Sequence, residues 1–195
     1  MTKLFVVFLT LASVGCASID LGYIRVFQES LKQNVISDLT PFYETGFSFI
    51  KAKKDNNEAI FILRNYENGY EYWVGADSEI IVTYSGLIVE TSGLDHDIFL
   101  HDKKKIEVNI LENDFKSYVS LTNPDAKYLV ANFQKLSNGE DIKNCEVQYV
   151  YKTIISSIGF NDTLIICQYS DGTIQRSIQR INPLDSLIEI NFYYQ

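Results

Sequence analysis

The chain is poor in the residues that carry most recognisable chemistry. Its 195 residues include two histidines, three cysteines, three prolines and one tryptophan. It contains no G-x-S-x-G elbow, no G-x-G-x-x-G loop, no phosphate-binding P-loop and no H-E-x-x-H pair, so motifs that indicate a mechanism by themselves are missing. No repeat with a period of roughly 20 to 50 residues occurs, and no Gly/Ser-rich or Pro-rich linker divides the chain. These absences exclude a solenoid and favour one domain.

The composition is that of a globular, acidic protein. Hydrophobic residues make up 46% of the chain and aromatic residues 13%, which is enough to bury a core. The formal net charge is -8 at pH 7, because 25 Asp and Glu outnumber 17 Lys and Arg. Such a charge repels nucleic acid and anionic lipid head groups at long range, so we expect no nucleic-acid partner.

The N-terminus has the pattern of a bacterial lipoprotein signal peptide. Lys3 precedes the apolar run 4–9, and small residues then lead into Cys16. The apolar run is too short to span a bilayer, which takes about 20 apolar residues. A cysteine at this place is the residue that receives lipid in lipoproteins, although Ser13 stands where leucine is usual.

We therefore expect a signal peptide over residues 1–15, lipidation of Cys16, and a single β-rich domain over 16–195. The roughly 180 residues that follow the signal have the length of one domain. Two alternatives are a secreted protein cleaved near Gly15 or Ala17, and a buried apolar segment with a chance cysteine.

One helix and many strands are expected. Apolar residues spaced by three and four predict a helix between residues 20 and 38. From residue 47 onward, short runs rich in β-branched and aromatic residues alternate with the turn pairs Asn68-Gly69, Ser85-Gly86, Asn138-Gly139 and Asp171-Gly172. The expected strands are 59–64, 70–74, 79–84, 87–91, 106–111, 128–136, 147–155, 163–169, 173–181 and 187–194. This density predicts an all-β fold, a mainly antiparallel sandwich or barrel with a short N-terminal helix.

One polar stretch, residues 95–102, carries both histidines among three carboxylates. His96 and His101 are five apart, which places them on opposite faces of a strand and well apart around a helix. That spacing does not suit shared coordination, so we expect neither a metal nor a cofactor. We interpret the stretch as a polar loop between strands.

Close acidic pairs and the internal cysteines are weaker candidates. The pairs Asp95/Asp97 and Glu140/Asp141 offer carboxylates for glycosidase chemistry, but such pairs arise by chance in an acidic chain. Cys145 and Cys167 form no C-x-x-C motif, which argues against a thiol redox centre. They are either a disulfide, as an oxidising compartment allows, or two small buried hydrophobes.

Two strands offer candidate faces for binding a glycan or a protein partner. Trp73 either fills the core or provides a stacking surface for sugar. The strand over 173–181 places Gln175, Ser177 and Gln179 on one face, which either lines a groove for a hydroxyl-rich ligand or is simply exposed. With Asp77, these residues form the candidate glycan or partner face.

Three parts of the chain resemble one protein family. The first is the lipoprotein signal. The second is 72–94, where Trp73 precedes a Gly-Ala-Asp turn and the next predicted strand ends near a threonine. A glycine then begins a segment that ends in the sequence Thr-Ser-Gly-Leu. The third is 171–183, where a glycine turn opens a strand with Arg-Ser-Ile-Gln and ends near Pro183. Together they resemble the group 4 capsule polysaccharide lipoprotein family, also called the YjbF/GfcB family. Leu87 stands where that family usually has arginine.

The resemblance implies an outer-membrane lipoprotein that faces the periplasm and assists the secretion or assembly of an exopolysaccharide or capsule. It implies no catalysis, and its expected partners are other periplasmic and outer-membrane components of polysaccharide export, with the polysaccharide as a further candidate. Ala17 after the lipidated cysteine suits outer-membrane sorting by the rule of enteric bacteria. Two alternatives are a periplasmic enzyme acting on glycan through residues 95–102, and a small-ligand carrier with an internal cavity of roughly several hundred Å3.

Overall fold

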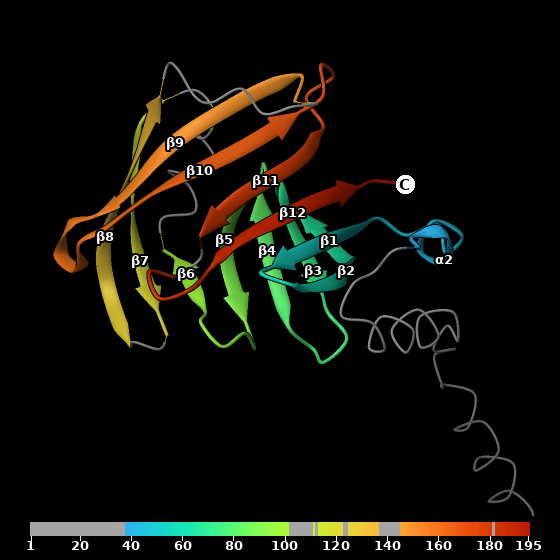
Figure 1. Ribbon diagram of the computed structural model, residues 1–195, viewed down its shortest axis with the longest axis horizontal. Helices are drawn as coiled ribbons and strands as arrows, with labels where there is room; N and C mark the ends of the chain where they lie inside the picture. Colours follow the sequence, from blue (N-terminus) through green and yellow to red (C-terminus); the bar gives the residue numbers. More distant parts are fainter. Residues whose placement is uncertain (1–37, 102–110, 112, 123–124, 137–144, 181) are drawn as a thin grey trace, which may run out of the picture.

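The structure is a computed structural model that describes residues 38–101, 111, 113–122, 125–136, 145–180 and 182–195. The described residues form twelve antiparallel strands in a closed barrel, which confirms the predicted all-β fold (Figure 1). A short helix near the N-terminus, α2, precedes the strands, and a 3-10 turn, η1, lies between two of them. The elements are α2 Thr40–Tyr43, β1 Phe49–Lys54, β2 Asn57–Glu67, β3 Tyr70–Val74, β4 Ile80–Tyr84, β5 Leu87–Ser92, β6 Ile98–Leu100, β7 Phe115–Leu121, β8 Ala126–Leu136, β9 Val147–Ile155, η1 Ser156–Ile158, β10 Phe160–Gln168, β11 Ile174–Arg180 and β12 Leu187–Tyr193.

Tight hairpin turns join neighbouring strands. Each strand pairs with the strands before and after it in the chain, and β1 pairs with β12 to close the barrel. Asn68 and Gly69 have φ values of 52° and 83°, and Ser85 and Gly86 have 48° and 82°. Two successive positive φ angles are typical of a type I′ turn, whose twist matches that of a hairpin. These two predicted turns are confirmed, whereas the pair 138–139 lies outside the described residues.

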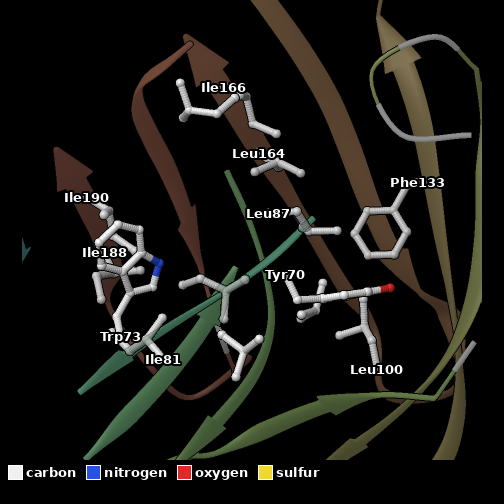
Figure 2. Close-up of a cluster of buried hydrophobic side chains, with 14 of the residues drawn as sticks. Tyr70, Trp73, Ile81, Leu87, Leu100, Phe133, Leu164, Ile166, Ile188 and Ile190 are labelled. Atoms are coloured by element: carbon white, nitrogen blue, oxygen red, sulfur yellow. The ribbon is translucent and has the colours of Figure 1, made fainter. Parts of the chain in front are cut away.

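Side chains fill the interior of the barrel. Figure 2 shows Trp73, Ile81, Ile188 and Ile190 gathered in one part of the buried cluster. Strands β4 and β5 each contain three consecutive buried residues, so they are buried on both faces. At the turn between them, a Cβ added to Gly86 would come within 3.1 Å of side chains on β10 and β11, which is why only glycine fits there. The β4–β5 hairpin therefore ends inside the molecule, against the opposite wall.

A second, smaller apolar cluster lies outside the barrel beneath α2. Phe42 of α2 packs against Phe49 of β1 with ring centroids 5.5 Å apart, and Phe49 stacks on Tyr193 of β12 at 4.7 Å. Ile60 and Ile62 of β2 complete this cluster. The segment that enters the barrel thus covers the outer side chains of Phe49, Ile60 and Ile62 on β1 and β2. In the described residues, no helix is both long enough and apolar enough to cross a membrane.

The expected strands match the structure in most places. The bounds of β3 and β9 are those predicted, and seven other predicted strands differ from the observed ones by a few residues at their ends. Strands β1, β6 and β7 were not expected, and β6 corrects the interpretation of residues 95–102 as a loop throughout. The predicted strand 106–111 and the predicted helix between 20 and 38 fall on positions outside the described residues, apart from Leu111 and Asp38.

Candidate functional site

Trp73 belongs to a buried hydrogen-bond network rather than to a sugar-stacking surface. Its side chain is 0% exposed, and its Nε1 donates to Thr83 Oγ1 at 2.8 Å. Thr83 Oγ1 donates in turn to Glu71 Oε2 at 2.7 Å, and the Tyr194 hydroxyl donates to Glu71 Oε1 at 2.7 Å. Burial excludes contact between Trp73 and a glycan in this fold, which corrects that half of the prediction.

The network ties the C-terminal segment after β12 to β3 and β4. Burial raises the pKa of the Glu71 carboxyl, and the hydrogen bonds from Thr83 and Tyr194 partly offset that rise. Burial and the neighbouring Glu71 also raise the pKa of the Tyr194 hydroxyl. A buried carboxyl with hydrogen bonds to both oxygens is satisfied where it stands, so we assign Glu71 a structural role.

The polar face of β11 also points inward. Ser177 is 0% exposed and Gln179 is 5% exposed. Gln179 Nε2 donates to the Gly86 carbonyl at 2.9 Å and to Ser177 Oγ at 3.0 Å, while its Oε1 accepts the Ile88 N–H at 3.0 Å. These bonds satisfy backbone groups at the buried tip of the β4–β5 hairpin. Ser177 and Gln179 therefore hold the fold, and their burial corrects the alternative that this face is simply exposed.

The two remaining residues of the predicted face lie apart from this cluster. Gln175 is half-buried, and its Oε1 is a buried oxygen without a hydrogen-bond partner in the described part of the chain. Asp77 is exposed in the β3–β4 turn, where its N–H donates to Glu79 Oε2 at 2.9 Å. The five predicted residues thus do not form one surface.

Cys145 and Cys167 form a disulfide, with their Cα atoms 5.3 Å apart. Cys145 lies just before β9, and Cys167 is a buried residue of β10 paired with Gln148. The bond therefore links the two strands at the open end of their hairpin. Cys16, the expected lipidation site, and the pair Glu140/Asp141 lie outside the described residues.

Asp97 and His101, two residues of the polar stretch 95–102, have different structural roles. The Asp97 carboxylate accepts hydrogen bonds from Thr91 Oγ1 at 2.9 Å and from the N–H groups of Gly93 and Leu94, each at 3.1 Å. Asp97 therefore organises the turn between β5 and β6. His101 lies on the barrel exterior among aromatic rings, and across the described residues no three His, Cys, Asp or Glu gather as metal ligands.

Two hollows in the described structure bear on the carrier alternative. One, of about 30 Å3, lies between β5–β8 and the strands β9–β11. The other, of about 170 Å3, opens at one end of the barrel, with an apolar floor and Lys54, Asp95 and Asp185 among its polar residues. Neither reaches the volume expected of a carrier for a drug-sized ligand, so these hollows give that alternative no support.

The exposed aromatic residues of β6–β8 form a surface that sequence reasoning missed. Phe99 is 36% exposed, Tyr118 46% and Tyr128 67%. The His101 ring lies between two of them, edge-on to Phe99 at 4.7 Å and stacked on Tyr128 at 4.8 Å. One pattern in the sequence could have predicted this surface. In β7 and β8, aromatic and aliphatic residues occur at both odd and even positions, so each strand presents some of them on both faces, one of which points outward.

Comparison with known proteins identifies a shared fold. No protein-family model and no curated protein matches this chain. Among solved structures, the chain is similar to the crystal structure of the hypothetical lipoprotein YmcC from Escherichia coli K12, with a TM-score of 0.65 and 14% sequence identity. The likeness covers 87% of this chain and 94% of that one. At this identity the two proteins share the barrel, and function has to be argued separately.

Proposed function

We propose that the chain is an outer-membrane lipoprotein that faces the periplasm and assists the secretion or assembly of an exopolysaccharide or capsule without catalysing a reaction. The observation that carries this proposal is the likeness to the lipoprotein YmcC over 94% of that protein's chain. It is joined here to a lipoprotein signal that ends at Cys16. The polysaccharide part of the proposal rests on the sequence resemblance of 72–94 and 171–183.

The two segments that carry the resemblance contact each other in the structure. Gln179 lies in the second segment, and it bonds to the Gly86 carbonyl and the Ile88 N–H in the first, 93 and 91 residues away. Trp73 of the first segment packs against Phe192 and Tyr194 beside the end of the barrel. The matching residues are thus the ones that hold the β4–β5 hairpin inside the molecule. This supports a common fold for the chain and the family that it resembles.

Lipidation at Cys16 gives the first test. Cells expressing the protein and fed labelled palmitate should incorporate label into it and retain it in the membrane fraction. Cys16→Ser should abolish both, because the thiol is the atom that receives lipid. Cys145→Ser is the matched control and should leave the labelling unchanged. Label that persists in Cys16→Ser would contradict a lipid anchor at this residue.

Deletion of the gene gives the second test, at the level of function. A strain without the protein should carry and release less polysaccharide, and the wild-type gene should restore the output. The Cys16→Ser gene should restore less, because the unanchored chain is diluted away from its outer-membrane partners. Unchanged output under conditions in which the gene is expressed would contradict the proposed function.

A further inference from the structure

The exposed rings of β6–β8 make a continuous aromatic surface on the outside of the barrel. We call Phe99, His101, Tyr118 and Tyr128 the aromatic face. The rings of Phe99 in β6, His101 just after β6 and Tyr128 in β8 are in contact, and the His101 N–H donates to the Tyr118 carbonyl at 2.8 Å, which places Tyr118 of β7 beside His101. Their neighbours Leu100 and Val119 point into the barrel and are 1% exposed. The aromatic rings therefore face outward by the alternation of their strands.

Tyr128 is held in this surface by a bulge. Val119 pairs with Leu129 and Leu121 with Ala126, so two residues of β8 stand opposite Ser120. Tyr128 has φ of 54°, a conformation that is uncommon for a bulky residue. A bulge re-aims the side chain that it carries, and here it directs the tyrosine ring onto His101. His101 Nε2 lies 2.7 Å from Ser120 Oγ, which fixes the ring between its aromatic neighbours.

Positive side chains lie on two strands of the aromatic face and on the neighbouring strand β9, in a chain whose net charge is negative. Strands β7, β8 and β9 contain Lys116, Lys127, Lys135 and Lys152 but no Asp or Glu. The chain as a whole has a net charge of -8. At distances beyond about 10 Å in physiological salt that net charge is largely screened, so the groups nearest the aromatic rings decide the attraction that a bound ligand feels. Two carboxylates are among those groups: Glu90 of β5 is the register partner of Phe99, and Asp125 precedes β8. Lys116 shares its face with Tyr118, two positions along β7. Lys127 adjoins Tyr128 in the bulge, and its Nζ lies 4.0 Å from Asp125 Oδ2 in an ion pair that is exposed to solvent and therefore weak.

The aromatic face lies on the side of the barrel away from the entering chain. In the closed strand order, β7 is six strands from β1 in either direction. The helix α2 packs on the outer side of β1 and β2, so the aromatic face and α2 lie on different sides of the barrel (Figure 1). A ligand on the aromatic face would therefore not contact α2.

We propose that the aromatic face binds an acidic polysaccharide, one whose sugar units carry carboxylates. Aromatic rings stack against the apolar C–H faces of sugar rings, as Tyr128 and Phe99 can do at the surface. Lysine ammonium groups pair with the carboxylates, and the tyrosine hydroxyls can bond sugar hydroxyls. This inference deepens the proposed function and rests on it only for its biological setting, because binding is a property of the surface alone.

The test measures binding of polygalacturonate, alginate and neutral dextran to the mature Cys16→Ser chain. Both uronate polymers should bind, more weakly as salt rises, and dextran should bind at least about tenfold more weakly. Tyr118→Ala combined with Tyr128→Ala should weaken uronate binding by about tenfold or more, as expected for removing aromatic anchors. Lys116→Gln with Lys127→Gln should weaken it about severalfold and reduce the salt dependence.

Matched controls come from the far side of the barrel. Tyr66 is 65% exposed on β2, close to the 67% of Tyr128, and Lys53 is exposed on β1. Tyr66→Ala and Lys53→Gln should leave uronate binding within about twofold of wild type, since changes outside an interface have little effect. Thermal melts of all variants should agree with wild type, because each substituted side chain is exposed.

Four results would overturn the inference. The first is that neither uronate polymer binds, and the second is that dextran binds as tightly as the uronates. The third is that Tyr66→Ala weakens uronate binding as much as the Tyr118/Tyr128 double variant does. The fourth is that vesicles of phosphatidylglycerol and phosphatidylcholine bind through the same residues while uronates do not bind. The last result would assign the face to a membrane surface.

Failure of the proposed function is a separate outcome. Unchanged export in the deletion strain would leave a measured uronate affinity standing, whereas reduced export without uronate binding would overturn only this face.

Discussion

Replacing Trp73 with alanine is expected to lower the free energy of unfolding by about 4 kcal/mol, as found for truncating large buried aromatic residues. The Trp73 side chain is 0% exposed, and its ring meets Phe192 and Tyr194 edge-on at 5.9 and 6.2 Å. Alanine would leave a cavity between β3 and β12 and remove the donor to Thr83. Denaturant melts followed by far-UV circular dichroism should show the loss.

Two controls separate volume from surface effects at this position. Trp73→Phe keeps most of the ring and loses the Nε1 donor, so it should destabilise the protein by about 1 to 2 kcal/mol. Tyr66→Ala removes an aromatic ring that is 65% exposed and should change stability by no more than about 0.5 kcal/mol. A Trp73→Ala protein with wild-type stability and reduced glycan affinity would restore the stacking role that the structure contradicts.

Removing the Cys145–Cys167 disulfide should destabilise the protein by about 3 kcal/mol, from the loop-closure entropy of a 22-residue separation. The appropriate variant is Cys145→Ser with Cys167→Ala, because Cys145 lies in an exposed segment whereas Cys167 is 1% exposed. An alanine at 167 avoids placing a hydroxyl in the core. Urea unfolding of the variant and of the oxidised wild-type protein gives the difference.

Thiol labelling checks the bond independently of stability. The unfolded, unreduced Cys16→Ser chain should react with no maleimide, and after reduction it should react at two positions. Reduced wild-type protein and the double variant should unfold at the same urea concentration. Two reactive thiols without reductant, or a variant as stable as the oxidised protein, would contradict the disulfide's contribution.

Local pattern was sufficient for most of the barrel. The pairs Asn68-Gly69 and Ser85-Gly86 specify type I′ turns by their need for positive φ, and both occur where expected. Strand β7 also alternates, with Phe115, Val119 and Leu121 inward, but the inward Ser117 breaks its apolar face. The outer face of β1 carries Lys51 and Lys53 beyond Phe49, which obscures a strand whose interior face is apolar.

The roles of the polar and aromatic residues depended on closure of the barrel, which local pattern does not encode. The sequence left Gln179 either lining a groove or exposed, whereas its partners Gly86 and Ile88 are about ninety residues distant in sequence. Trp73 was given both a core and a surface interpretation because either face of a strand can turn inward. Tyr128 reaches His101 through a bulge, and one extra residue in a strand cannot be located from alternation alone.

The central claim is that the protein acts on a polysaccharide after its synthesis. The most direct measurement follows labelled sugar in the deletion strain through the sugar-nucleotide pool, the periplasmic polymer and the released polymer. The account predicts a normal sugar-nucleotide pool, with less labelled polymer at the cell surface and in the medium and with unexported polymer in the periplasm. A released fraction equal to that of the wild-type strain would contradict it, as would a sugar-nucleotide pool that changes before any polymer is made.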